Sequence, residues 1–223
     1  MKSALIATGF AVSALGSTAQ AQQAAEGNWL VRVRALQLDM ADHSSAGNGN
    51  SGITSALLPK NAVSVSDKVI PELDISYFFT KNIAAELVLT IPQKHSVKIG
   101  KGPLDGAKVG TFKHLPPSLL LQYHFLPDST FRPYVGAGVN YTRIWGVDFD
   151  KLDAVTGTNS NLDRGSWGLA LQAGFDIKLD NNLFLNVDVK KINIRSDLSI
   201  GGRKVSTVKV DPLLWGIGIG YRF

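Results

Sequence analysis

The sequence predicts an all-β fold, namely an eight-stranded antiparallel transmembrane β-barrel with long extracellular loops and short periplasmic turns. Three observations predict it. The chain ends on a strictly alternating segment, similar segments precede it, and the connections between them alternate between long and short. Segments of about ten residues that alternate between apolar and polar positions are typical of strands in outer-membrane barrels.

The C-terminal segment, residues 211–223, has the clearest alternation. Successive side chains of a strand point to opposite faces, so a period of two separates an apolar face from a polar or small one. An apolar outer face suits a hydrocarbon environment, and aromatic residues at its ends suit the membrane interfaces. The apolar face carries Leu213, Trp215, Ile217, Ile219, Tyr221 and Phe223, and the opposite face carries Gly216, Gly218, Gly220 and Arg222.

The first residues have the pattern of a secretory signal peptide. A charged start precedes an apolar stretch at residues 4–12, and small residues follow at Ala19 and Ala21 with the usual cleavage spacing. We expect residues 1–21 to be removed and residues 22–223 to form a single outer-membrane β-barrel domain. No later stretch is long and apolar enough for a transmembrane helix, so a membrane-spanning chain must close into a barrel.

The first four strands are predicted at 28–38, 65–79, 83–91 and 115–125. Each alternates apolar side chains with charged, hydroxyl or amide side chains. The last four are predicted similarly at 135–142, 167–178, 183–194 and 211–223. Eight strands form a barrel whose interior is just wide enough to be filled by side chains.

Three irregularities interrupt the alternation. Leu36 and Leu38 fall on the polar face of the first strand, which indicates a bulge or an inward apolar patch. Lys190-Lys191 breaks the register of the seventh strand before the apolar positions resume, which again suggests a bulge. The third strand is expected to fade after Pro92 into a loop at 100–103.

The connections alternate between long polar segments and tight turns, as in outer-membrane barrels with large loops outside and short turns in the periplasm. The first long segment, 39–61, is rich in Gly, Ser and Asn, and another, 148–164, contains a predicted helical turn at 149–153. The tight turns are 80–82, 127–129 and 180–182.

Charged side chains collect on the inward face of the predicted barrel. Because an unpaired buried charge is very costly, a mixture of both signs favours mutual pairing in a structural plug over a charged ion pore. The predicted plug consists of Arg32, Arg34, Glu72, Asp74, Glu86, His124, Asp176, Asp188, Lys190 and Arg222.

Prolines recur at nearly one height above the periplasmic end, about 25 Å up the tilted strands and close to the outer edge of the apolar band. Proline cannot donate to the ladder, so it marks edges, bulges and breaks. These prolines either show where strands leave the membrane or let neighbouring strands part, with an opening to the side. The candidate residues of such an opening are Pro71, Ile91, Pro92, Leu115, Pro116, Pro117 and Leu120.

Three segments, 113–125, 131–142 and 211–223, resemble the OmpW family of outer-membrane barrels, including its AlkL-like branch. The resemblance implies a cell outer-membrane location and a narrow barrel with a hydrophobic channel that conducts small apolar molecules inward. It also implies that the C-terminal aromatic signal, Tyr221 and Phe223, is read by the barrel assembly machinery. With the side opening, the expected function is passive uptake of small hydrophobic molecules with lateral release into the outer leaflet.

Other functions stay open at this stage. The loops of a structural or receptor-type barrel would contact phage, bacteriocin or host without transport. A lipid-modifying enzyme would need a serine beside a histidine, and the closest candidates are His95-Ser96, His43-Ser44 and the pair His124 and Ser118. Asp148, Asp150 and Asp153 could hold calcium, although a solvated acidic turn explains them equally well.

The amino-acid composition limits the classes of partner that the protein is expected to bind. There is no cysteine, and the basic residues behind the net charge of +5 are scattered rather than clustered, which argues against nucleic acid. We expect a monomer without cofactor, whose partners are outer-membrane lipid, the assembly machinery and a small apolar ligand. Acidic headgroups are a natural partner for surplus lysine and arginine.

Overall fold

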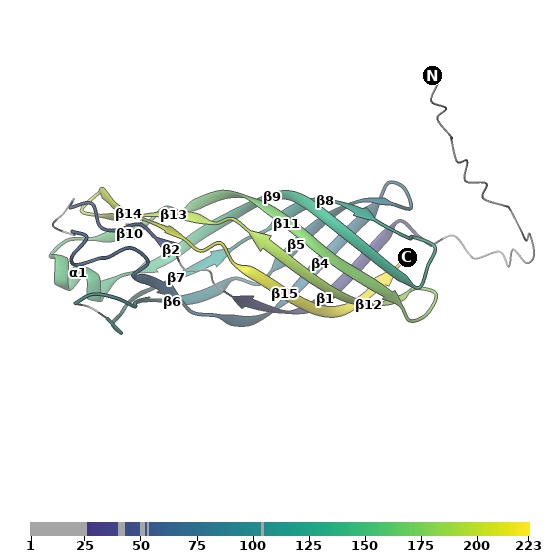
Figure 1. The fold of residues 1–223 in the computed structure, drawn as a ribbon, viewed down its shortest axis with the longest axis horizontal. Helices are drawn as coiled ribbons and strands as arrows, with labels where there is room; N and C mark the ends of the chain where they lie inside the picture. Colours follow the sequence, from purple (N-terminus) through teal and green to yellow (C-terminus); the bar gives the residue numbers. More distant parts are fainter. Residues whose placement is uncertain (1–25, 40–42, 50–51, 53, 104) are drawn as a thin grey trace, which may run out of the picture.

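In the computed structural model, eight strands form a closed antiparallel barrel that is elongated at one end (Figure 1). The structure describes residues 26–39, 43–49, 52, 54–103 and 105–223, so the predicted signal peptide lies outside the described residues. The barrel strands are β1 (Trp29–Asp39), β4 (Lys68–Phe78), β5 (Ile83–Thr90), β8 (Ser118–His124), β9 (Phe131–Asp148), β11 (Gly165–Lys178), β12 (Leu183–Ile192) and β15 (Leu213–Arg222).

Each barrel strand pairs with its two neighbours in an antiparallel ladder. The order runs β11-β12-β15-β1-β4-β5-β8-β9, and the pairing of β9 with β11 closes the ring. The first and last strands lie side by side, with Val33 opposite Ile219. Closure removes the exposed edges that an open sheet would present, and it satisfies backbone groups that water cannot reach in a bilayer.

The connections confirm the predicted alternation. Turns after β4, β8 and β11 are short and lie at the end that also holds the C-terminus (Figure 1). The connections at the opposite, extracellular end carry further strands, of which four form a separate sheet and the others extend the barrel sheet from β9. Their elements are β2 (His43–Ser44), β3 (Val63–Val65), β6 (Gln93–Ile99), β7 (Lys108–Leu115), α1 (Asp150–Thr156), β10 (Ser160–Leu162), β13 (Arg195–Ile200) and β14 (Arg203–Lys209).

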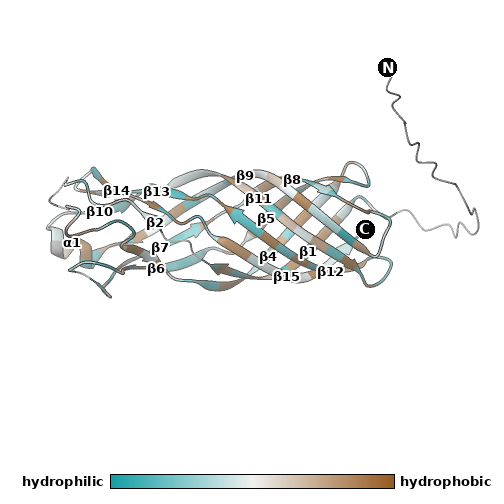
Figure 2. Ribbon diagram, viewed as in Figure 1, coloured by the Kyte–Doolittle hydropathy of each residue, from teal (hydrophilic) through white to brown (hydrophobic). Residues whose placement is uncertain are grey.

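The outer surface of the barrel is apolar along the membrane band and aromatic at both ends of it. Apolar and polar residues alternate along the strands, as the colours in Figure 2 show. Near the extracellular end Tyr141 and Trp167 pack with ring centroids 4.8 Å apart. Near the periplasmic end Trp29 and Tyr77 are 4.9 Å apart. Such aromatic girdles sit at the two membrane–water interfaces. Among the described residues, no helix is long and apolar enough to cross a membrane.

Of the three irregularities predicted from the sequence, one agrees with the structure and two do not. β1 runs without a register shift and turns Leu36 and Leu38 inward, so the apolar patch is correct there. The bulge at Lys190-Lys191 was wrong, because β12 keeps its register with both neighbours and Ile192 also points inward. The chain after Pro92 does not fade into a loop but continues as β6.

Candidate functional site

The lumen is filled in layers that differ in chemistry. From the periplasmic end upward these are a charged rim, a buried network of charges, an apolar layer and an apolar chamber among the extracellular elements. The layers follow from the alternation, because inward positions become apolar above the membrane band.

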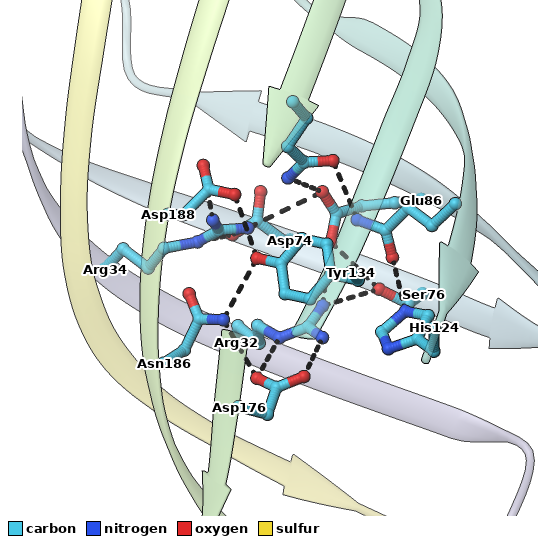
Figure 3. Close-up of polar contacts among 12 residues, drawn as sticks. Arg32, Arg34, Asp74, Ser76, Glu86, His124, Tyr134, Asp176, Asn186 and Asp188 are labelled. Atoms are coloured by element: carbon cyan, nitrogen blue, oxygen red, sulfur yellow. Dashed lines mark hydrogen bonds and ion pairs between the residues drawn. The ribbon is translucent and has the colours of Figure 1, made fainter. Parts of the chain in front are cut away.

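The network of charges is centred on two arginines of β1 (Figure 3). Arg32 donates two hydrogen bonds to Asp176, from Nε at 3.1 Å and from Nη2 at 2.7 Å. Its Nη1 donates to Glu86 at 2.8 Å and to Ser76 at 2.9 Å. The Arg32 side chain is fully buried, so these bonds replace the water that its charge would otherwise require.

Arg34 holds the other half of the network. Its guanidinium forms ion pairs with Asp74 at 2.5 Å and with Asp188 at 2.8 Å. Lys190 joins the same group, with Nζ 2.7 Å from Glu72 and 2.8 Å from Asp188. The carboxylates come from β4, β5, β11 and β12, so the network links strands all around the barrel.

Eight of the ten residues predicted to form the plug lie in this network. His124 lies next to it, where its Nε2 is 3.0 Å from Gln122 and its ring stacks on Tyr134 with centroids 4.9 Å apart. Arg222 is separate, because it lies at the periplasmic rim with its guanidinium 3.9 Å from the centre of the Phe78 ring.

Neutral side chains that the sequence did not single out complete the network. The Tyr134 hydroxyl donates to Asp188 at 2.9 Å. Gln122 donates to Gln172, and Gln172 donates to Glu86, each at 2.8 Å. Their inward positions follow from the alternation, but a neutral side chain gives no signal in the sequence that it joins a network of charges.

The periplasmic rim is held by Glu26, which precedes β1. Its carboxylate accepts from Arg132 at 2.6 and 2.8 Å, from Lys178 at 2.9 Å and from Arg222 at 3.0 Å. Burial by itself would raise the pKa of Glu26, but the hydrogen bonds from Arg132 and Lys178 outweigh it and lower the pKa to about 2. Glu26 thereby links β9, β11 and β15 at this end of the barrel.

An apolar layer covers the network on its extracellular side. The side chains are all less than a twentieth exposed, and an ion that crossed this layer would lose its water without gaining a polar partner from them. The residues are Leu36, Leu38, Ile70, Val88, Leu120, Ala170, Ile192 and Leu214.

An apolar chamber lies above this layer, enclosed by β3, β6, β7, β13, β14 and the segment around α1. It encloses a cavity of about 120 Å³. Its lining is almost wholly aliphatic and aromatic, with only His114, Thr142 and Ser196 as polar members. Representative lining residues are Val65, Val97, Phe112, Ile144, Phe149 and Ile194.

The barrel ladder is interrupted beside this chamber. The pairing of β5 with β8 ends at Val88 opposite Ser118, and pairing resumes between β6 and β7 at Gln93 opposite His114. A second interruption lies next to it, because β4 and β5 pair no further than Glu72 opposite Thr90. The two interruptions share the corner at residues 91–92.

The candidate residues of the side opening border these interruptions, with one exception. Pro71 and Pro92 are exposed, and Ile91 points outward with 55% of its surface accessible. Pro116 and Pro117 interrupt the other edge, where Asn140 donates to both of their carbonyls at 3.0 Å. Leu115 pairs with Arg143 on β9. Leu120 instead points inward and belongs to the apolar layer.

Residues 25–223 match the model of the OmpW family. The chain is 39% identical over 203 residues to an uncharacterized outer-membrane protein, y4mB, of Sinorhizobium fredii, covering 87% of this chain and 80% of that protein. It is 34% identical to outer membrane protein W of Vibrio cholerae, covering 96% and 97%. The chain belongs to the OmpW family.

Further comparisons agree with this assignment. The crystal structure of the outer membrane protein OprG from Pseudomonas aeruginosa superposes with a TM-score of 0.75 at 32% identity, covering 90% of this chain and 98% of that one. A relative from the same species, the dibenzothiophene metabolism operon protein PahQ, is 31% identical and covers 74% and 77%. The protein is therefore an OmpW-family barrel of the outer membrane.

Among the described residues, two of the three histidines considered for catalysis contact groups other than a serine hydroxyl. His95 contacts the carbonyl of Ser66 rather than a serine hydroxyl, and His124 contacts Gln122. Asp148 and Asp153 accept backbone hydrogen bonds from residues 150 and 160. Among the described residues, no group of three or more His, Asp or Glu side chains could hold a metal ion.

Proposed function

We propose that the protein is a channel for the passive uptake of small hydrophobic molecules, with release sideways into the outer leaflet. The observation that carries this proposal is an apolar chamber that ends above a filled lumen. A molecule inside the chamber meets side chains of its own polarity, which is the usual character of a small-molecule site. The relative PahQ is named for an operon of dibenzothiophene metabolism, and dibenzothiophene is an apolar aromatic compound, which supports the same substrate class.

The route through the barrel axis is unfavourable for an apolar molecule. Below the chamber it would have to displace the apolar layer and then separate Arg32 and Arg34 from their carboxylates, which is costly for buried charges. The interrupted ladder beside residues 91–92 offers a shorter way from the chamber to the hydrocarbon of the outer leaflet. The proline carbonyls at 116 and 117 stay hydrogen-bonded to Asn140, so the interruption leaves few backbone groups unsatisfied.

The charge network then serves as a plug that blocks leakage of ions while the chamber stays open to the outside. We also infer that one chain is the functional unit, because the eight strands close on themselves and need no partner to complete the wall. Lipid, the assembly machinery and the apolar substrate remain its proposed partners.

The experiment measures uptake of naphthalene by whole cells that express equal amounts of folded barrel. Replacing Pro92 and Pro116 together with Val restores two backbone donors at the interruption, and we expect uptake to slow. Pro212→Val is the matched control, because it restores a donor at the edge of β15, away from the interruption.

A second variant tests the chamber itself. Val97→Trp fills part of the cavity, and we expect it to slow uptake without altering the ladder. If cells with wild-type protein take up naphthalene no faster than cells without it, transport is excluded and a structural or receptor-type surface role is favoured. Normal uptake by the Pro92, Pro116 double variant would retain transport but remove the sideways exit.

A further inference from the structure

One of two neighbouring histidines lines the chamber, and the proposed passage of hydrocarbons uses neither of them. His95 on β6 and His114 on β7 lie with ring centroids 4.8 Å apart, and Phe112 packs against both. Their side chains are buried, at 0% and 5% exposure. His114 and Phe112 line the chamber, close to where the pairing of β6 with β7 begins beside the interrupted ladder.

Both rings carry a buried nitrogen without a hydrogen-bond partner among the described residues, Nε2 of His95 and Nδ1 of His114. His95 Nδ1 lies 2.9 Å from the carbonyl of Ser66, which can only accept, so this nitrogen holds the proton. Burial lowers the pKa of both rings, that of His114 to about 3, so both are neutral near pH 7. The free nitrogen of His95 is therefore an acceptor.

The other polar side chains of the lining are already engaged. The Thr142 hydroxyl donates to Asn140 at 2.7 Å, and the Ser196 hydroxyl lies 3.4 Å from the carbonyl of Asp163. Of the three polar residues in the lining, only His114 has a buried polar atom without a hydrogen-bond partner among the described residues. A buried polar atom without a partner is costly, and a ligand that supplies the missing hydrogen bond removes that cost.

We propose that His114, with His95 beside it, is a polar anchor that selects apolar molecules carrying one hydrogen-bonding group, such as an alcohol or a phenol, over plain hydrocarbons. This inference rests on the proposed uptake function and names its preferred substrate class. The apolar body fills the chamber against Phe112, and the single polar group meets the unpaired imidazole nitrogen. A neutral imidazole can donate or accept, so a hydroxyl satisfies it in either orientation.

The test compares 1-naphthol with naphthalene, which share the same ring system. Binding to the protein in lipid nanodiscs is measured by ligand fluorescence and corrected for partitioning into empty nanodiscs. We expect wild-type protein to bind 1-naphthol about three- to tenfold more tightly, the ratio that one net hydrogen bond supplies. His114→Phe keeps a ring but removes the nitrogens, and it should abolish this ratio by weakening 1-naphthol alone.

Three further variants make the result specific. Thr111→Val removes a buried hydroxyl of β7 that is not part of the chamber lining, and it should leave the ratio unchanged. His114→Asn places an amide near the position of Nδ1 and should restore part of the preference. His114→Leu repeats the removal if the phenylalanine variant yields no heat-modifiable, folded barrel.

Two results would overturn the anchor alone. One is equal binding of the two ligands by wild-type protein that takes up naphthalene, and the other is an unchanged ratio in folded His114→Phe or His114→Leu. If wild-type protein binds neither ligand and does not speed uptake of naphthalene, the proposed function fails together with the anchor.

Discussion

At the scale of single residues, the arginines of β1 show why buried charges here are all partnered. Arg32 and Arg34 cannot release their protons, so each must find carboxylates inside a lumen too narrow for bulk water. The alternation of β1 points both side chains into the lumen, where they lie beside Asp176 and Asp74 from other strands. A buried pair is tolerated only while both partners are present.

Replacing Glu86 with Ala should therefore destabilise the barrel by about 3–5 kcal/mol, because it leaves the Arg32 charge without one of its two carboxylates. Urea unfolding in lipid vesicles measures this loss, and Glu86→Gln, which keeps the shape and an acceptor oxygen, should lose less. Ion selectivity should not change. A stable Glu86→Ala barrel with altered single-channel selectivity would argue for a water-filled ion pathway.

Glu26 makes the stability of the periplasmic rim depend on pH. Its pKa falls from 4.5 to about 2 in the folded protein. A carboxyl whose folded pKa is lowered stabilises the fold above pH 4.5 and loses that contribution as the pH falls to about 2. Glu26→Gln should therefore cost about 1 kcal/mol at pH 7 and much less near pH 2, where the Glu26 carboxyl has taken up much of its proton.

The measurement is thermal unfolding of both proteins across this pH range in one detergent. Lys81 and Asp128 form an exposed ion pair, 2.8 Å apart, at the same end of the barrel. Asp128→Asn is thus a control with little effect. A difference between Glu26→Gln and wild type that stays constant from pH 7 to pH 2 would contradict the assignment.

At the scale of elements, the contact between β1 and β15 depends on glycine at one position. A Cβ on Gly218 would lie 2.1 Å from the carbonyl oxygen of Val33 and 2.7 Å from Cα of Arg34, which are backbone atoms that cannot move aside. A Cβ on Gly216, in the same strand and on the same face, would meet only flexible side-chain atoms at 3.1 and 3.3 Å. The two strands thus approach most closely at the level of the charge network.

Gly218→Ala should therefore lower the yield of folded barrel and destabilise what folds by about 1–3 kcal/mol, the usual cost of overpacking. Gly216→Ala should stay within about 1 kcal/mol of wild type, since nearby side chains can shift. Heat-modifiable mobility and urea unfolding report both quantities. Equal behaviour of the two variants would show that the close approach at Gly218 is unimportant.

The sequence predicted the membrane part of these elements well and the part above it poorly. In the membrane, apolar side chains face outward to lipid. Above it, the outward face meets water and the apolar side chains turn inward. This inversion occurs at Leu36 and Leu38 in β1 and at Ile192 in β12. If every apolar side chain of a strand is assumed to face outward, this inversion predicts a bulge, although the backbone register is unbroken.

The candidate site was predictable to the same degree. Inward charges could be named because each one breaks an apolar pattern on a strand of known period. Which of these charged side chains meet could not be predicted, because the distance between Arg32 and Asp176 depends on the stagger of strands far apart in sequence. The chamber was not predicted from the sequence for a related reason, since Pro92 marks the end of the membrane strand but not the end of the sheet.

At the scale of the whole molecule, the C-terminal residue joins the last strand of the barrel to the start of the first. Phe223 exchanges backbone hydrogen bonds with Trp29 at 2.9 and 3.0 Å, while its side chain is 58% exposed toward the membrane interface. It thus has a structural contact in the ladder besides its proposed role as a signal for the assembly machinery.

Deleting Phe223 should reduce insertion into the outer membrane, and so should Phe223→Asp, which keeps the two backbone bonds but removes the aromatic ring. Phe223→Tyr should insert normally. The amount of heat-modifiable barrel in the membrane fraction measures each case, and we expect at least a severalfold loss for the first two. Normal amounts of folded barrel from both would exclude a role of this residue in assembly.

The pairing of the first strand with the last also constrains the order in which the barrel can form. Arg32 and Arg34 enter with the first strand, yet Asp176 and Asp188 follow on the sixth and seventh. Until all these strands have met, hydrocarbon around a half-built wall would surround charges without counterions. The lumen must therefore remain wet during construction and lose its water only as the seam closes, which makes insertion and the sealing of the interior one cooperative event.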